Sequence, residues 1–239
     1  MTRLLKALGI AMSAMAMFAV MASAAHAETG TLTATEYPAF ITGEQSAPVV
    51  FDIGAGPART VECAISRMDS TITGPADPVT FKPSYAGCIS NPGGVPATVT
   101  VNNCDYSFGV SRPNTTGIEF PTTGRLHASL NCPAGPPLEI HVYENAAKHM
   151  ENVTTCRYDI GTQGPVPAGI YHNVVAAAPP DILATVNATF NAFNTQGPMA
   201  ICGAMAFQNI PITLTGKYTL RGFQDIEGAE GAQIPIDIG

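Results

Sequence analysis

Two histidines and one glutamate are the residues of this sequence whose types and spacing best suit chemistry. His127 lies in the alternating run RLHASL, and Glu139 and His141 lie in the alternating run LEIHVY. The apolar residues of each run share one face of a strand, which puts these three side chains on the polar face. A hairpin of strands 125–132 and 138–143, joined by the turn PAGPP, makes the two histidines near or diagonal neighbours. Two imidazoles and a carboxylate can hold a metal ion or share a proton in hydrolysis.

The alternative is a solvated sheet face that carries ordinary polar residues, and we favour it. The sequence contains no Gly-x-Ser-x-Gly elbow, no His-Glu-x-x-His pair, no glycine-rich phosphate loop and no EF-hand spacing. We therefore predict no catalytic, cofactor-binding or metal-binding residue and lean away from an enzyme. A secreted hydrolase or metal-binding enzyme with a site around His127, His141 and Glu139 stays as the second hypothesis.

Six cysteines give the sequence another kind of chemistry, the formation of disulfide bonds. They are Cys63, Cys88, Cys104, Cys132, Cys156 and Cys202. No two of them lie closer than 16 residues, whereas structural zinc sites favour cysteines in closely spaced pairs. An even number of cysteines in an exported chain is typical of a disulfide framework, so we predict three disulfides.

The pairing of these cysteines follows from the expected strands only in part. The strand after 138–143 folds back over a short helix, which brings Cys132 and Cys156 to one edge, and we predict that bond. For the other four cysteines two pairings stay open. Hairpin register favours Cys63–Cys88 with Cys104–Cys202, whereas an internal repeat favours Cys63–Cys104 with Cys88–Cys202.

The elements that must position these residues are short β-strands. Apolar and polar residues alternate in PVVFDIG, ATVTVNN, RLHASL, LEIHVY and PITLTGKYTL. The clearest run is ILATVNATFNAF, whose apolar face carries Ile182, Ala184, Val186, Ala188, Phe190 and Ala192. Clusters such as NPGG, PAGPP and TQGPVPAG end the runs, because proline and glycine set turn conformations. We predict an all-β, disulfide-stapled, sandwich-like fold with one short helix at residues 143–151.

One pattern occurs twice in the chain. The segment VNNCDYSFG at 101–109 and the segment VTTCRYDIG at 153–161 share Val, Cys, Tyr and Gly at the same offsets. Each follows a proline-led alternating strand, which favours duplication of a three-stranded unit, with chance similarity as the alternative. A boundary in the polar segment SRPNTTGIEFPTTG then predicts two related β subdomains, residues 28–115 and 122–239.

Residues 1–27 have the pattern of a cleaved secretory signal. Arg3 and Lys6 begin it, an apolar run follows, and Ala25-His26-Ala27 offers small residues at the cleavage site, so we expect the cut before Glu28. The apolar run is short for a membrane span of about 20 residues. We predict a chain secreted to the periplasm or the extracellular space, with no stable membrane span in its mature part.

The net negative charge of the chain argues against two classes of binding partner. The sequence carries 11 basic and 18 acidic residues, and removal of Arg3 and Lys6 takes the net charge from −7 to −9. Nucleic acid and anionic membrane surfaces both need a positive face on the protein. Neither is therefore an expected partner.

Several strand and cysteine motifs give the chain a resemblance to known sequences. VECAIS, PSYAGC, ATVTVNNCDYSF, LNCPAGPPLEIHVY, TTCRYDIG and LTGKYTLRGF, spread over residues 61–223, resemble a group of uncharacterised secreted proteins of actinobacteria. The resemblance implies a β-rich fold with disulfides and brings no functional residues. We expect a secreted, non-enzymatic β protein that serves as an envelope or extracellular binding or structural module, with an unknown partner and no cofactor.

Overall fold

A computed structural model describes residues 28–54, 59–112, 123–133, 135–151, 153–174, 179–197, 202, 208–226 and 229–238. The predicted signal peptide, residues 1–27, lies outside the described residues. The same is true of residues 113–122, which hold most of the predicted subdomain boundary.

Antiparallel strands dominate the described part of the chain. The strands are β1 (Glu28–Gly30), β2 (Leu32–Ala34), β3 (Ala39–Gln45), β4 (Val49–Ile53), β5 (Arg59–Ile72), β6 (Val79–Asn91), β7 (Val95–Thr100), β8 (Asp105–Arg112), β9 (Thr123–Asn131), β10 (Leu138–Val142), β11 (Cys156–Ile160), β12 (Gln163–Val174), β13 (Asp181–Gln196), β14 (Gln208–Ile226), β15 (Ala229–Ile234) and β16 (Ile236–Ile238). A short helix, α1 (Ala146–Met150), precedes β11.

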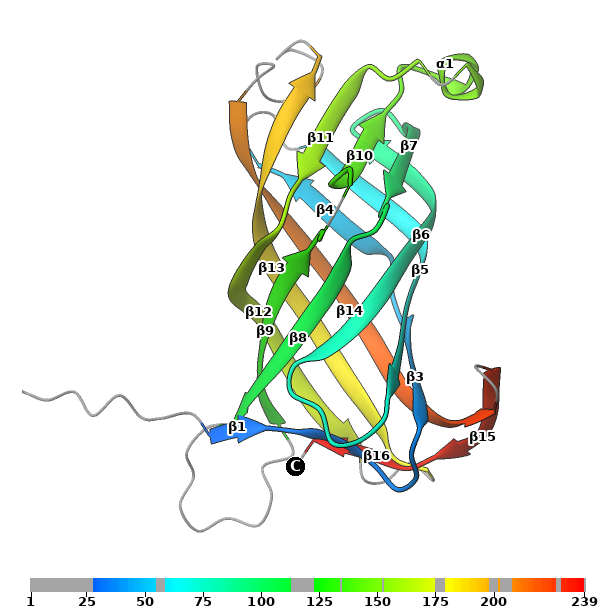
Figure 1. The fold of residues 1–239 in the computed structure, drawn as a ribbon. Coiled ribbons are helices and arrows are strands. Elements are labelled where there is room, and N and C mark those ends of the chain that lie inside the picture. Colours follow the sequence, from blue (N-terminus) through cyan, green and yellow to red (C-terminus); the bar gives the residue numbers. More distant parts are fainter. Residues whose placement is uncertain are drawn as a thin grey trace, which may run out of the picture.

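The main sheet closes on itself. Four long strands, β5, β6, β13 and β14, run the length of the molecule (Figure 1). At the end that carries α1 the ring is completed by β7, β10, β11 and β4, and at the opposite end by β8, β9, β12 and β3. The pairings β13–β14 and β6–β8 close the ring at that opposite end. The hydrogen bonds of the long strands are therefore satisfied on both sides by neighbouring strands.

The apolar face of each strand points into this closed sheet. In β13 the six apolar residues of the predicted inner face, from Ile182 to Ala192, are all buried, and the Thr and Asn residues between them face outward. Period-two alternation has this consequence because successive side chains leave a strand on opposite sides. The prediction that ILATVNATFNAF is a strand with one buried face is confirmed.

The all-β fold with disulfides is confirmed, and so is the short helix. Asn145 caps α1, because its side chain accepts a hydrogen bond of 2.9 Å from the backbone N–H of Lys148. No helix in the part of the chain that the structure describes has the length and apolarity needed to cross a membrane.

The sandwich arrangement and the two subdomains are not confirmed. Strands of the N-terminal half pair with strands of the C-terminal half inside one closed sheet, as in β7–β10, β8–β9 and β3–β14. A sandwich instead requires two separate sheets packed face to face.

Three disulfides tie together strands of the sheet or the segments next to them. Cys63 and Cys88 are directly opposite each other on β5 and β6, which confirms the bond that hairpin register favours. Cys104–Cys132 joins the residue before β8 to the residue after β9. Cys156–Cys202 ties the start of β11 to the chain beyond β13.

The predicted bonds Cys132–Cys156 and Cys104–Cys202 are wrong. So are the repeat-based alternatives Cys63–Cys104 and Cys88–Cys202. The Cys132–Cys156 prediction assumed a hairpin of β9 and β10, which does not form, and Cys104–Cys202 followed from it by elimination, whereas the alternatives assumed a repeated unit. After β9 the chain passes from the end opposite α1 to the end that carries α1. There β10 pairs with β7 and β11, whereas β9 pairs with β8 and β12 at the opposite end.

A separate two-stranded sheet, which we call the terminal cover, lies at the end of the molecule opposite α1 (Figure 1). It consists of β2 and β16, paired from Leu32↔Ile238 to Ala34↔Ile236. Leu32 also exchanges two backbone hydrogen bonds of 3.0 Å with Ala76, in the turn between β5 and β6. Leu32, Ile236 and Ile238 are buried, so the cover turns its apolar side toward the interior of the closed sheet.

Candidate functional site

Strands β10 and β11 bring four charged or ionisable side chains together on the outer face of the sheet. Their register places Glu139 opposite Asp159 and His141 opposite Arg157. The alternate residues of both strands, such as Ile140, are buried inside the sheet. We call these four residues, with Asn102 and Thr154, the Glu139 cluster.

Both carboxylate oxygens of Glu139 are engaged. One lies 2.8 Å from His141 Nε2, and the other lies 3.1 Å from Arg157 Nη2. The Asn102 amide adds a longer contact of 3.4 Å to the second oxygen. Arg157 also donates from Nε to Asp159 over 2.8 Å, and this hydrogen bond is the main reason why its pKa is raised. Glu139 is only 13% exposed, so its partners replace most of the water that would otherwise solvate its charge.

Thr154 extends this cluster into a chain of hydroxyl, imidazole and carboxylate. Its Oγ1 lies 3.0 Å from His141 Nδ1, on the other side of the ring from Glu139. When Nε2 carries the proton and donates to Glu139, Nδ1 accepts from the Thr154 hydroxyl. The order of groups is that of a hydrolytic triad, in which the imidazole takes a proton from the hydroxyl.

The two described backbone N–H groups that flank Thr154 are not available as oxyanion-hole donors. Acyl transfer needs free N–H donors that stabilise the developing oxyanion. The N–H of Val153 donates to Lys148 O over 2.8 Å, and the N–H of Thr155 donates to Val142 O over 2.9 Å. The Thr154 carbonyl itself accepts 2.7 Å from Gln196 Nε2. The segment is thus hydrogen-bonded down onto neighbouring strands, which is what a structural anchor requires.

His127 does not belong to the cluster. It lies on β9, opposite Gly109 of β8 and Pro167 of β12. Strands β12, β13 and β11 separate β9 from β10 in the sheet. The prediction that His127 and His141 are neighbours is therefore wrong, for the same reason that the β9–β10 hairpin is wrong.

Metal binding finds no support in the described ranges, since no three His, Cys, Asp or Glu side chains gather there in a way that could hold an ion. Sequence reasoning identified Glu139 and His141 but missed Thr154, Arg157 and Asp159. Alternation in CRYDI places Arg157 and Asp159 on a polar face. Only the pairing of β10 with β11 shows that this face adjoins Glu139.

Three tyrosines pack in or against the core of the closed sheet, of which Tyr106 and Tyr218 are buried and Tyr85 is half-buried. The hydroxyls of Tyr85 and Tyr106 lie 3.3 Å apart, and the Tyr218 hydroxyl lies 2.9 Å from Ser66 Oγ. Burial raises the pKa of Tyr218 to about 12. Burial also raises the pKa of Tyr85 and Tyr106 above the ordinary value. These hydroxyls consequently stay neutral at physiological pH and act as hydrogen-bonding groups.

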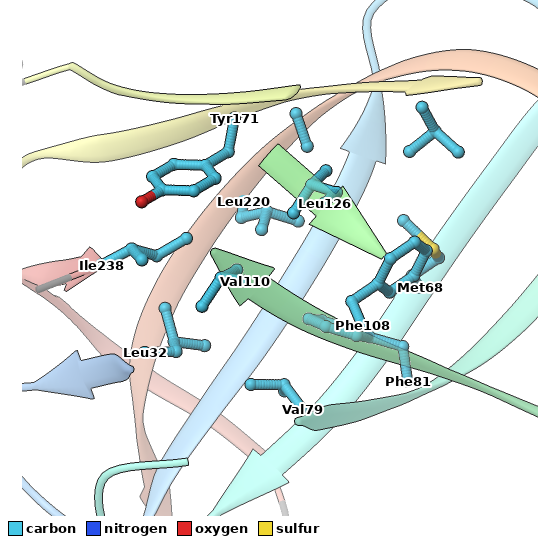
Figure 2. A pocket seen from close by; sticks show the side chains of 12 residues that line it. Leu32, Met68, Val79, Phe81, Phe108, Val110, Leu126, Tyr171, Leu220 and Ile238 are labelled. Carbon is cyan, nitrogen blue, oxygen red and sulfur yellow. The ribbon is translucent and has the colours of Figure 1, made fainter. Parts of the chain in front are cut away.

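An apolar cavity lies inside the closed sheet, and the terminal cover forms part of its wall. Its volume is about 30 Å³. Figure 2 shows the side chains that converge on it, which are Leu32, Met68, Val79, Phe81, Phe108, Val110, Leu126, Tyr171, Ala184, Val186, Leu220 and Ile238. Tyr171 carries the only hydroxyl of this set, and no member is charged at neutral pH. A cavity of this chemistry stays dry, because water needs two or more polar partners.

Comparison with known proteins yields no relative, since no protein-family model, no curated protein and no solved structure matches this chain. The resemblance to secreted actinobacterial proteins thus stays an expectation.

Proposed function

We propose that the protein is a non-enzymatic binding module that works outside the cytoplasm and takes up a small apolar molecule. The observation that carries this proposal is the apolar cavity inside a closed, disulfide-tied sheet. Closed sheets of about eight strands are wide enough to hold one small ligand. Apolar lining with few polar groups is the usual character of a small-molecule site.

Export is part of the proposal. Disulfides persist in oxidising compartments such as the periplasm and the extracellular space, and all six cysteines are paired. The sequence of residues 1–27 supplies a matching secretory signal, with the cut before Glu28. The partner or ligand is thus expected among molecules of the envelope or the medium.

The absence of enzymatic activity is proposed from the Glu139 cluster. The backbone N–H groups on both sides of Thr154 are already hydrogen-bonded. Arg157 shares Glu139 with His141, which weakens the carboxylate as an orienting group for the imidazole. We assign the cluster to the anchoring of segment 153–155 on β10 and β13.

The size of the cavity defines how a ligand enters. About 30 Å³ is well below the roughly 150 Å³ that accommodates benzene in a protein interior. Leu32 and Ile238 project from the terminal cover into this space (Figure 2). A ligand that displaces these two side chains occupies the cavity together with the volume they fill, so the cover is the expected entrance.

Thermal unfolding in the presence of indene, an apolar bicyclic hydrocarbon, tests the proposal. Binding to the folded state at ten times the Kd stabilises it by about 1.4 kcal/mol, which raises Tm by a few degrees. The matched variant Ala184→Val places two more carbons in the cavity and should abolish the shift. A wild-type Tm that indene does not change, or an equal shift of Tm in Ala184→Val, contradicts the proposal.

A secreted hydrolase is the second candidate, and the Thr154–His141–Glu139 chain is the observation that favours it. Metal analysis of the purified protein and a screen of ester substrates would test it. Loss of either a bound metal ion or a measured turnover in His141→Ala, at unchanged Tm, would support this candidate over the binding module.

A further inference from the structure

We propose that the ligand of the cavity carries one hydrogen-bond donor, which pairs with Oδ1 of Asn173. This inference rests on the proposed binding function and specifies the chemistry of the ligand. The ligand class is a neutral, apolar molecule with a single O–H or N–H group, such as a phenol, an alcohol or an indole.

Asn173 adjoins two residues that line the cavity, Tyr171 on its own strand and Ile238 of the terminal cover. It follows Tyr171 by two residues on β12, so both side chains leave the strand on the inner face. Asn173 is 7% exposed. Its Nδ2 donates over 3.1 Å to the carbonyl oxygen of Ile238, whose side chain lines the cavity. The side-chain amide therefore sits where the terminal cover meets the cavity wall.

The Oδ1 atom of Asn173 is a buried acceptor that no described group satisfies. Leaving such a group without a partner costs about 1–3 kcal/mol, so nearly all buried polar atoms in folded proteins are paired. Because the same amide is bonded to Ile238, a residue that lines the cavity, we infer that a guest in the cavity supplies the missing donor.

The charge of the ligand follows from the same surroundings. No residue that lines the cavity is ionised at neutral pH. A carboxylate or an ammonium group there would lose its hydration without gaining a counter-charge, which is strongly unfavourable. A neutral donor loses much less hydration and gains the hydrogen bond to Oδ1.

Indole and indene form a matched pair of probes, because they share a shape and only indole has an N–H. Titrations of the full mature protein by calorimetry or NMR give the Kd of each probe. A neutral hydrogen bond contributes about 0.5–1.5 kcal/mol, so wild type should bind indole about 2–10-fold more tightly than indene. In Asn173→Leu, which removes the acceptor at similar volume, the two Kd values should become equal.

Two variants keep the outcomes distinct. Retained indene binding in Asn173→Leu shows that the variant is folded and its cavity intact, and Ala184→Val should lose both probes. Equal affinities of the two probes in wild type would overturn the role of Asn173 while leaving the binding function in place. Failure of both probes to bind wild type would overturn the binding function and the inference with it.

Discussion

Gly124 lacks a side chain at a place where the ring of Tyr171 needs the room. The two residues are direct partners in the register of β9 and β12, and a Cβ on Gly124 would collide with the Tyr171 ring and hydroxyl. Tyr171 is fully buried and cannot swing away. Gly124→Ala should therefore lower the free energy of unfolding by about 1–3 kcal/mol, the usual cost of overpacking.

Denaturant unfolding of Gly124→Ala and of a control, Gly74→Ala, measures this effect. A Cβ on Gly74 would meet no atom within 4 Å, so that variant should stay within about 0.5 kcal/mol of wild type. Equal stability of the two variants would show that Tyr171 is not held as described.

The buried tyrosines make stability sensitive to high pH. Burial holds the pKa of Tyr218 at about 12, whereas the unfolded chain titrates near 10. The contribution of neutral Tyr218 to the free energy of unfolding is complete below pH 10. It is lost between pH 10 and 12, because there the unfolded state releases a proton that the folded state keeps. Tyr218→Phe should reduce the slope of unfolding free energy against pH in this window by about 1 kcal/mol per pH unit.

Urea unfolding at pH 9, 10 and 11 measures the two slopes. Burial also raises the pKa of Tyr85 and Tyr106, so part of the slope should remain in the variant. The variant also leaves Ser66 without its partner and should be less stable than wild type at pH 7. An unchanged slope would mean that Tyr218 is not buried in the folded protein.

The sequence predicts where strands lie, but it does not predict which strands pair with each other. Alternation identified β13, β10 and β9, because the burial of one face is written in every second residue. The partner of each strand is not written there. The PAGPP segment has the composition of a hairpin turn, yet it links β9 and β10, which complete the closed sheet at opposite ends. The wrong Cys132–Cys156 bond and the wrong His127–His141 contact both come from that one assumption.

The Cys104–Cys132 bond should be a major stabiliser of the β8–β9 pair. It closes a loop of 28 residues, which in the chain-entropy model stabilises the folded state by roughly 3–4 kcal/mol. The double variant Cys104→Ala with Cys132→Ala should lose about that amount in denaturant unfolding.

Peptide mapping of the unreduced protein by mass spectrometry is the companion measurement. It should yield one cross-linked peptide pair for Cys104 with Cys132 and another for Cys156 with Cys202. A pair that joins Cys132 to Cys156 would instead restore the β9–β10 hairpin.

For the molecule as a whole, the shared long strands predict one cooperative unfolding transition. The closed sheet shares four strands between its two ends, β5, β6, β13 and β14. Neither end can therefore open without breaking hydrogen bonds at the other. Strands of residues 28–115 also pair with strands of residues 122–239, as in β7–β10 and β3–β14. Neither half contains all the strands of a closed ring.

Calorimetry and two spectroscopic probes decide between one unit and two. Far-UV circular dichroism follows the strands, and tyrosine fluorescence follows the interior, since the chain has 7 tyrosines and no tryptophan. Coincident curves, with a calorimetric enthalpy equal to the van't Hoff enthalpy, are expected for a single unit. Two separated transitions, or a folded product from expression of residues 122–239 alone, would show that the halves are independent despite their shared sheet.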